Sequence, residues 1–148
     1  MGPSEILGCG PPSEFLVYET EKIPALKIPS GILLLKNSVR PQKPVKIPAG
    51  FLCVLESKNS AAAALLKGSA CTAVTCGTGQ RDTLSIAGLE STGATISLQR
   101  SLASLTGKML EPHDFNVVFS QKHSPFQTLF VSAALLISGV DSSNGYIV

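Results

Sequence analysis

The sequence predicts one all-β domain, a sandwich or barrel of short strands. The chain has 148 residues, which suits a single domain with a core of useful size. Its 13 glycines and 10 prolines stand between short apolar runs, a pattern that favours strands joined by turns over long helices. Strand candidates follow one another at intervals of about 8–12 residues, which is typical of sandwiches and barrels.

Each strand candidate is either a short apolar run or an alternation of apolar and polar residues. The candidates are Phe15–Tyr18, Ile32–Lys36, Phe51–Leu55, Cys71–Thr75, Thr83–Leu89, Phe115–Phe119 and Leu129–Ile137. One short helix is expected within Ser57–Lys67, because Ala61–Ala64 favours a helix and Asn59 or Ser60 can cap it. The segment Leu102–Leu110 fits either a strand or a helix.

Composition divides the chain into three parts. Residues 1–14 are rich in Gly, Pro and Ser and predict a flexible arm, residues 15–138 form the β domain, and residues 139–148 form a polar tail. The longest apolar run, Thr128–Val140, is shorter than the roughly 20 residues that cross a bilayer, so no membrane span is expected. Met1–Gly10 lacks the features of a signal peptide, so the four cysteines are expected as free thiols in a reducing, intracellular compartment.

Charge is unevenly distributed although the net charge is only +2. Eight basic residues and one acid, Glu56, lie between Lys22 and Lys67. This stretch fits a basic face for phosphate or, as the simpler reading, solvated lysines that protect strand edges. Aromatic residues are not interleaved with the lysines, so nucleic acid is not an expected partner. The spacing of cysteines and histidines matches no zinc ligand pair, and neither a metal nor a cofactor is expected.

No catalytic motif is visible in the sequence. Gly-x-Ser-x-Gly, Walker-type and Gly-x-Gly-x-x-Gly patterns do not occur, and no two carboxylates form an obvious acid–base couple. Gly77-Thr78-Gly79 is interpreted as a tight turn. From the residues alone, the prediction is a β domain without an active site.

The order of the segments resembles the trimeric dUTPase family. The turn Ile28–Gly31, the turn Val45–Gly50 and the loop Ser57–Ala62 follow the family's turn, turn and phosphate-binding loop at matching spacing. Phe15–Tyr18 is similar to the family's first motif, and Ser142–Tyr146 is loosely similar to its Gly-rich C-terminal arm. The resemblance covers roughly residues 15–110 and implies a jelly-roll or distorted β-barrel that assembles as a homotrimer.

The departures from the family fall where its chemistry is. Ser57, Lys58, Asn59 and Ser60 form a degenerate phosphate loop, in which Lys58 replaces an arginine and loses the planar fork that grips phosphate. The position of the catalytic aspartate falls on Thr75 or Cys76. The first-motif aspartate falls on Leu16. The resemblance therefore implies that no catalytic residue remains and that dUTP is not hydrolysed.

Among dUTPase relatives, the chain is most similar to inactive viral proteins of the adenoviral early-region-four type. This implies a non-enzymatic interaction module that engages host signalling or scaffold proteins in the cytoplasm or nucleus. Tyr146, Ile147 and Val148 are expected to bind a PDZ domain as an added strand, although an apolar terminus packed on its own domain is an equally simple interpretation. Two alternatives stay open: an active dUTP nucleotidohydrolase with divergent motifs, and a virion structural jelly-roll protein.

Overall fold

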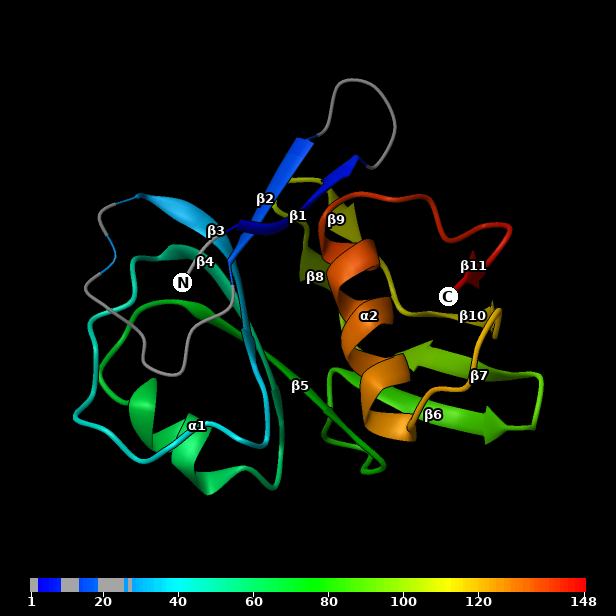
Figure 1. Ribbon diagram of the computed structural model, residues 1–148, viewed down its shortest axis with the longest axis horizontal. Helices are drawn as coiled ribbons and strands as arrows, with labels where there is room; N and C mark the ends of the chain where they lie inside the picture. The colour runs from blue at the N-terminus through cyan, green and yellow to red at the C-terminus, as the bar shows by residue number, and fades with distance from the viewer. Residues whose placement is uncertain (1–2, 9–13, 19–25, 27) are drawn as a thin grey trace.

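A computed structural model describes residues 3–8, 14–18, 26 and 28–148 (Figure 1). Strand β1, Pro3–Gly8, pairs antiparallel with β2, Glu14–Tyr18, in a separate two-stranded sheet. Part of the segment expected as a loose arm is therefore paired. The basic residues Lys22 and Lys27, with Cys9, lie outside the described residues.

The remaining strands form one main sheet and one small hairpin. The seven strands of the main sheet are β3 (Ser30–Leu35), β4 (Gly50–Glu56), β5 (Thr72–Gly77), β6 (Leu84–Leu89), β7 (Gly93–Leu98), β10 (His113–Val118) and β11 (Tyr146–Ile147). They lie side by side in the order β11-β10-β7-β6-β5-β4-β3. The segment that fitted either a strand or a helix forms the hairpin of β8, Leu102–Ala103, and β9, Met109–Leu110.

The chain is mostly β, as the sequence predicts, and the sheet is curled. Strands β3 to β6 run parallel, β6, β7 and β10 pair antiparallel, and β11 is parallel to β10. Only Cys76↔Leu84 and Gly77↔Ser85 join β5 to β6, so β6 begins beside the end of β5 and continues the sheet in a new direction. Jelly-rolls are built from antiparallel strands, and the parallel half of this sheet departs from that pattern.

In the part of the chain that the structure describes, two helices pack on the sheet. Helix α1, Ser60–Leu65, confirms the helix expected after β4, and Asn59 is its N-cap. Helix α2, Pro125–Ile137, corrects the prediction of a strand at Leu129–Ile137. Its first turn carries a complete capping box between Ser124 and Gln127. This motif marks the start of a helix, whereas the apolar run alone fits a helix or a strand. Within the described part of the chain, neither helix has the length and apolar character needed to cross a bilayer.

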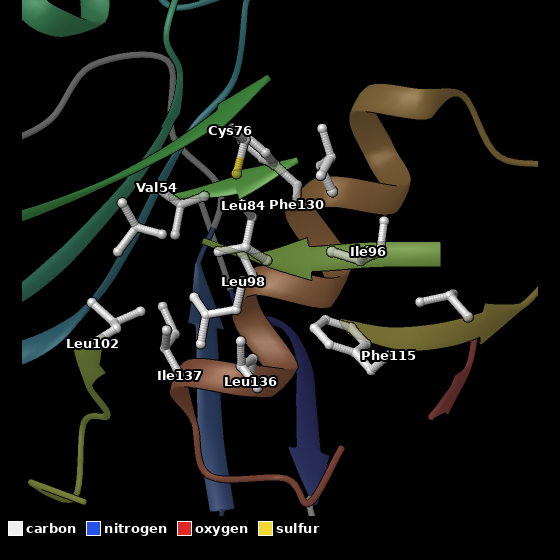
Figure 2. Packing of buried hydrophobic residues seen from close by; sticks show 14 of the residues in the cluster. Val54, Cys76, Leu84, Ile96, Leu98, Leu102, Phe115, Phe130, Leu136 and Ile137 are labelled. Atoms are coloured by element: carbon white, nitrogen blue, oxygen red, sulfur yellow. The ribbon is translucent and has the colours of Figure 1, made fainter. Parts of the chain in front are cut away.

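The core lies on both faces of the parallel strands because side chains alternate along β4. Leu52 and Val54 face α2 and join the largest buried cluster, in which Leu84, Ile96 and Phe130 also pack (Figure 2). On the opposite face, β4 packs against α1 in one small cluster and against Val45 and Ile47 in another. The main sheet is thus buried on both faces at β4, which positions the end of this strand rigidly.

Candidate functional site

The segment predicted as a degenerate phosphate loop lies at the carboxyl end of β4, between that strand and α1. Ligands of parallel sheets commonly bind at this end of the strands. Lys58, Asn59 and Ser60 line one open pocket of about 300 Å³. The other lining residues are Asn37, Val39, Glu56 and Ala61.

Hydrogen bonds fix the shape of this pocket. The Asn59 side chain accepts a bond of 3.1 Å from the Ala62 amide and donates bonds of 3.3 and 3.4 Å to the Lys36 carbonyl and to Asn37 Oδ1. Asn37 in turn donates a bond of 2.6 Å to Glu56 Oε2. Asn59 therefore ties the end of β3 to the start of α1, and its polar atoms are already used within the protein.

The loop presents few of its own backbone donors. The Ser57 amide donates to the Cys76 carbonyl at 3.0 Å, and the Asn59 amide donates to the Glu56 carbonyl at 2.9 Å. A phosphate cradle instead points successive N–H groups at its ligand. The exposed Lys58 brings one positive charge to the pocket, and the half-buried Glu56 brings one negative charge that opposes an anion. This loop is suited to a mixed polar contact better than to a triphosphate.

A second groove, of about 500 Å³, lies on the other side of the loop and includes Ser57. Its remaining lining residues are Leu55, Ala63, Ala64, Leu66, Lys67, Ala73 and Thr75. Most of these side chains are apolar and three of them are alanines, so the groove offers an apolar surface beside the polar pocket. Lys58 and Lys67 supply positive charge to the two hollows.

The positions that the resemblance assigns to the catalytic aspartate lie at the end of β5. The Thr75 hydroxyl accepts a hydrogen bond of 3.1 Å from the Thr83 amide. Cys76 is fully buried in the core next to Leu84 and Phe130 (Figure 2). Burial, and secondarily the negative charges of Asp82 and Glu56, raise the pKa of the Cys76 thiol to about 12. Neither residue offers a base near neutral pH.

A carboxylate that the sequence did not single out as a site residue lies at the same strand end. Asp82 is only 5% exposed, and its Oδ2 accepts a hydrogen bond of 2.9 Å from the Gly79 amide. Gly77 makes room for this carboxylate, because a Cβ there would lie 2.4 Å from Asp82 Oδ2 and 2.9 Å from Ser57 Oγ. The sequence did carry a signal for this arrangement. Gly77-Thr78-Gly79 precedes Asp82, and two glycines without side chains leave room for the aspartate to fold back over the turn.

The predicted partner-binding residues lie at the opposite edge of the main sheet. Tyr146 is buried against Phe115, with ring centroids 5.3 Å apart, whereas Ile147 is 77% exposed. The Val148 amide donates to the Val118 carbonyl at 2.9 Å, and the Val148 carbonyl accepts a bond of 2.8 Å from Ser120 Oγ. A two-residue strand and the buried Tyr146 hold these residues on β10.

Within the described residues, no three His, Cys, Asp or Glu side chains gather as a metal-binding group. The basic stretch is exposed at Arg40, Lys43, Lys46, Lys58 and Lys67. The comparisons with known proteins do not extend this description. No family model, no curated protein and no solved structure matches the chain, so the resemblance to dUTPases rests on the residues quoted above.

Proposed function

We propose that this protein is a non-enzymatic, dUTPase-like module that binds host proteins. The observation that carries this proposal is the end of β5, where the Thr75 hydroxyl is tied to Thr83 and the Cys76 thiol is buried with a raised pKa. A general base must be deprotonated near the working pH and within reach of the water it activates. Neither group meets both conditions.

The Ser57–Ser60 loop supports the same proposal. Its Ser57 and Asn59 amides donate to carbonyls of the protein itself, and Glu56 lies in the same pocket. Lys58 can attract an anion, but a single exposed lysine gives a weaker and less directional contact than the bidentate arginine of the family. Tight binding of a nucleoside triphosphate at this loop is therefore not expected.

The polar pocket and the apolar groove beside α1 favour recognition of a protein surface. Protein partners gain most of their binding energy from a few side chains that fill pockets, and polar contacts at the rim add specificity. The groove is mostly apolar. Lys58, just before α1 in the chain, lines the pocket, and Lys67, just after α1, lines the groove. A partner that presents an apolar side chain flanked by acidic residues fits this arrangement. The family resemblance further implies that three copies of the chain assemble.

Capture of Tyr146, Ile147 and Val148 by a PDZ domain stays part of this proposal, with one added requirement. These residues are paired with β10 and Tyr146 is buried, so the last strand must leave the sheet before it can pair with another protein. The apparent affinity for the PDZ domain then equals the affinity of the released strand multiplied by the fraction of molecules in which the strand is released.

The proposal is tested by measuring pyrophosphate release from dUTP with Mg²⁺, together with the mass of the particle by light scattering. We expect no turnover and a homotrimer. Turnover within the usual enzymatic range of about 1–10³ s⁻¹ would overturn the non-enzymatic proposal. A PDZ array probed with the intact protein and with Val148→Asp tests the tail, and Ile147→Asp serves as the control that keeps the terminal valine.

One observation favours a second candidate, an active dUTP hydrolase. The Asp82 carboxylate lies beside Gly77 and Ser57, at the strand end where the family keeps its catalytic aspartate. If dUTP is hydrolysed and Asp82→Asn lowers the rate by about 10²–10⁴-fold, Asp82 is the base and this candidate replaces the first. Hydrolysis that survives Asp82→Asn would exclude this role for Asp82.

A further inference from the structure

A serine and a histidine that are far apart in the sequence meet beside the edge of the sheet. His113 Nε2 lies 2.7 Å from Ser142 Oγ, and His113 Nδ1 lies 2.7 Å from the carbonyl oxygen of Glu111. A carbonyl oxygen only accepts hydrogen bonds, so the Nδ1 atom carries the proton in the neutral ring. Nε2 is then the acceptor, and the Ser142 hydroxyl donates to it.

The protein holds the histidine on an ordered element. His113 is the first residue of β10 and is paired with Leu98 of β7. Its ring lies against Phe115, with centroids 5.7 Å apart. The Glu111 carbonyl fixes the tautomer of the ring, although it supplies no negative charge to stabilise an imidazolium ion.

A tight turn holds the serine. The Gly145 amide donates to the Ser142 carbonyl at 2.9 Å, and Asp141 Oδ1 accepts the Ser143 amide at 3.0 Å. Gly145 has a φ of +70°, and a Cβ there would lie 2.3 Å from the Asn116 carbonyl oxygen, so the turn sits close on β10. Both Ser142 and His113 are half-buried, which leaves them reachable from solvent.

A serine hydroxyl is a weak nucleophile unless a base within hydrogen-bonding distance takes its proton, and the base is most effective when a third group orients it. Ser142, His113 and the Glu111 carbonyl have this relationship. We propose that Ser142 is a nucleophile activated by His113 and a site of covalent modification by activated acyl and phosphonyl donors. The proposal concerns the β10 edge and does not depend on the function assigned to the Ser57–Ser60 loop.

The chemistry requires no other reactant. Ser142 Oγ forms a bond to the carbonyl carbon of an activated ester while its proton moves to His113 Nε2. The bond from that carbon to the leaving oxygen breaks, and the leaving group receives the proton from the imidazolium. The products are an acylated serine, a free alcohol and a neutral histidine. With a fluorophosphonate, the P–F bond breaks instead, and fluoride and a proton are released.

The test uses the whole protein and a fluorophosphonate probe, with the labelled peptide identified by mass spectrometry. We expect one label per chain, on Ser142, and no label after Ser142→Ala. His113→Gln keeps a side chain that can accept the serine hydrogen bond but removes the base, so it should slow labelling by about 10²–10⁴-fold. Ser143→Ala changes the neighbouring serine, whose hydroxyl is hydrogen-bonded to Asp141. This variant should be labelled at the rate of the unchanged protein.

Thermal melts of all four proteins separate chemistry from folding. If His113→Gln melts like the unchanged protein but is labelled as fast, His113 is only a structural tie and the proposal is overturned. Labelling of the folded protein that is no faster than labelling after heat unfolding also overturns it. If Ser142→Ala fails to fold, the comparison of His113→Gln with Ser143→Ala still decides the question.

Discussion

The carboxylate of Asp82 lies so close to Gly77 that any side chain at position 77 would collide with it. A Cβ on Gly77 would stand 2.4 Å from Asp82 Oδ2. The collision would be with a buried group held by the Gly79 amide, so relief requires movement of the 77–82 turn. Ser57 Oγ borders the same space, because the Cβ would also lie 2.9 Å from it.

We predict that Gly77→Ala destabilises the protein by about 1–3 kcal/mol, the usual cost of overpacking a filled site. Urea unfolding monitored by circular dichroism measures the change. Gly88→Ala is the matched control, because the nearest atoms to a Cβ there are 4.0 Å away. Its effect should stay within about 0.5 kcal/mol. Equal stability of the two variants would show that the turn yields freely around Asp82.

A second prediction concerns the cap of α1. Asn59→Ala removes the bond to the Ala62 amide and the bonds to Lys36 and Asn37, so it should cost about 1–2 kcal/mol of unfolding free energy. Ser60→Ala, at an exposed position one residue later, is the control and should have little effect. Loss of stability in Ser60→Ala but not in Asn59→Ala would show that Ser60, and not Asn59, caps α1.

Local signals explain how much of the fold was visible in the sequence. Short apolar runs gave the positions of β3, β4, β6 and β10, and the alanine-rich segment gave α1. Helix α2 was missed because its apolar side chains form a continuous run that also fits a buried strand. Ser124-Pro125-Phe126-Gln127 carried the contrary signal, a capping residue, a proline at the first helical position and a glutamine at the third.

Parallel pairing was also beyond a local reading, since it depends on which distant strands meet. Lys58, Asn59 and Ser60 are consecutive in the chain, so the sequence could single them out together, but the pocket also needs Asn37 and Val39 from a distant segment. The meeting of His113 with Ser142 was not, because 29 residues separate them and β11 brings them together only by pairing with β10. Spacing along the sequence carries no information on such a contact.

A third prediction follows from the opposite environments of the last two residues. Val148 packs against the main core cluster, whereas the Ile147 side chain is 77% exposed. Val148→Asp should lower the free energy of unfolding by about 1–3 kcal/mol, because a charge replaces a partly buried apolar group. Ile147→Asp should change it by less than about 0.5 kcal/mol. A free tail would tolerate both changes equally, so identical melting curves would contradict the paired strand.

The last prediction concerns unfolding by base. The pKa of Cys76 is raised from 9.0 to about 12 in the folded protein, chiefly by burial. Burial and the charge of Asp141 also raise the pKa of Tyr146 above its ordinary value of 10.0. In both cases the unfolded chain loses its proton first. The stabilisation is therefore complete below the unfolded pKa and is lost as the pH rises toward the folded pKa.

For Cys76, the loss should begin near pH 9 and continue to about pH 12, at up to about 1.4 kcal/mol for each pH unit. Urea unfolding at pH 8, 9, 10 and 11 measures this slope. Cys76→Ala should be less stable at pH 8, because it leaves a small cavity, but its stability should fall less steeply above pH 9. Tyr146→Phe removes a second titrating group and the hydrogen bond of 2.8 Å to the Val140 carbonyl, so it should flatten the curve only above about pH 10. If Cys76→Ala keeps the full slope, the Cys76 thiol does not titrate as its burial requires, and the buried end of β5 must be open to solvent.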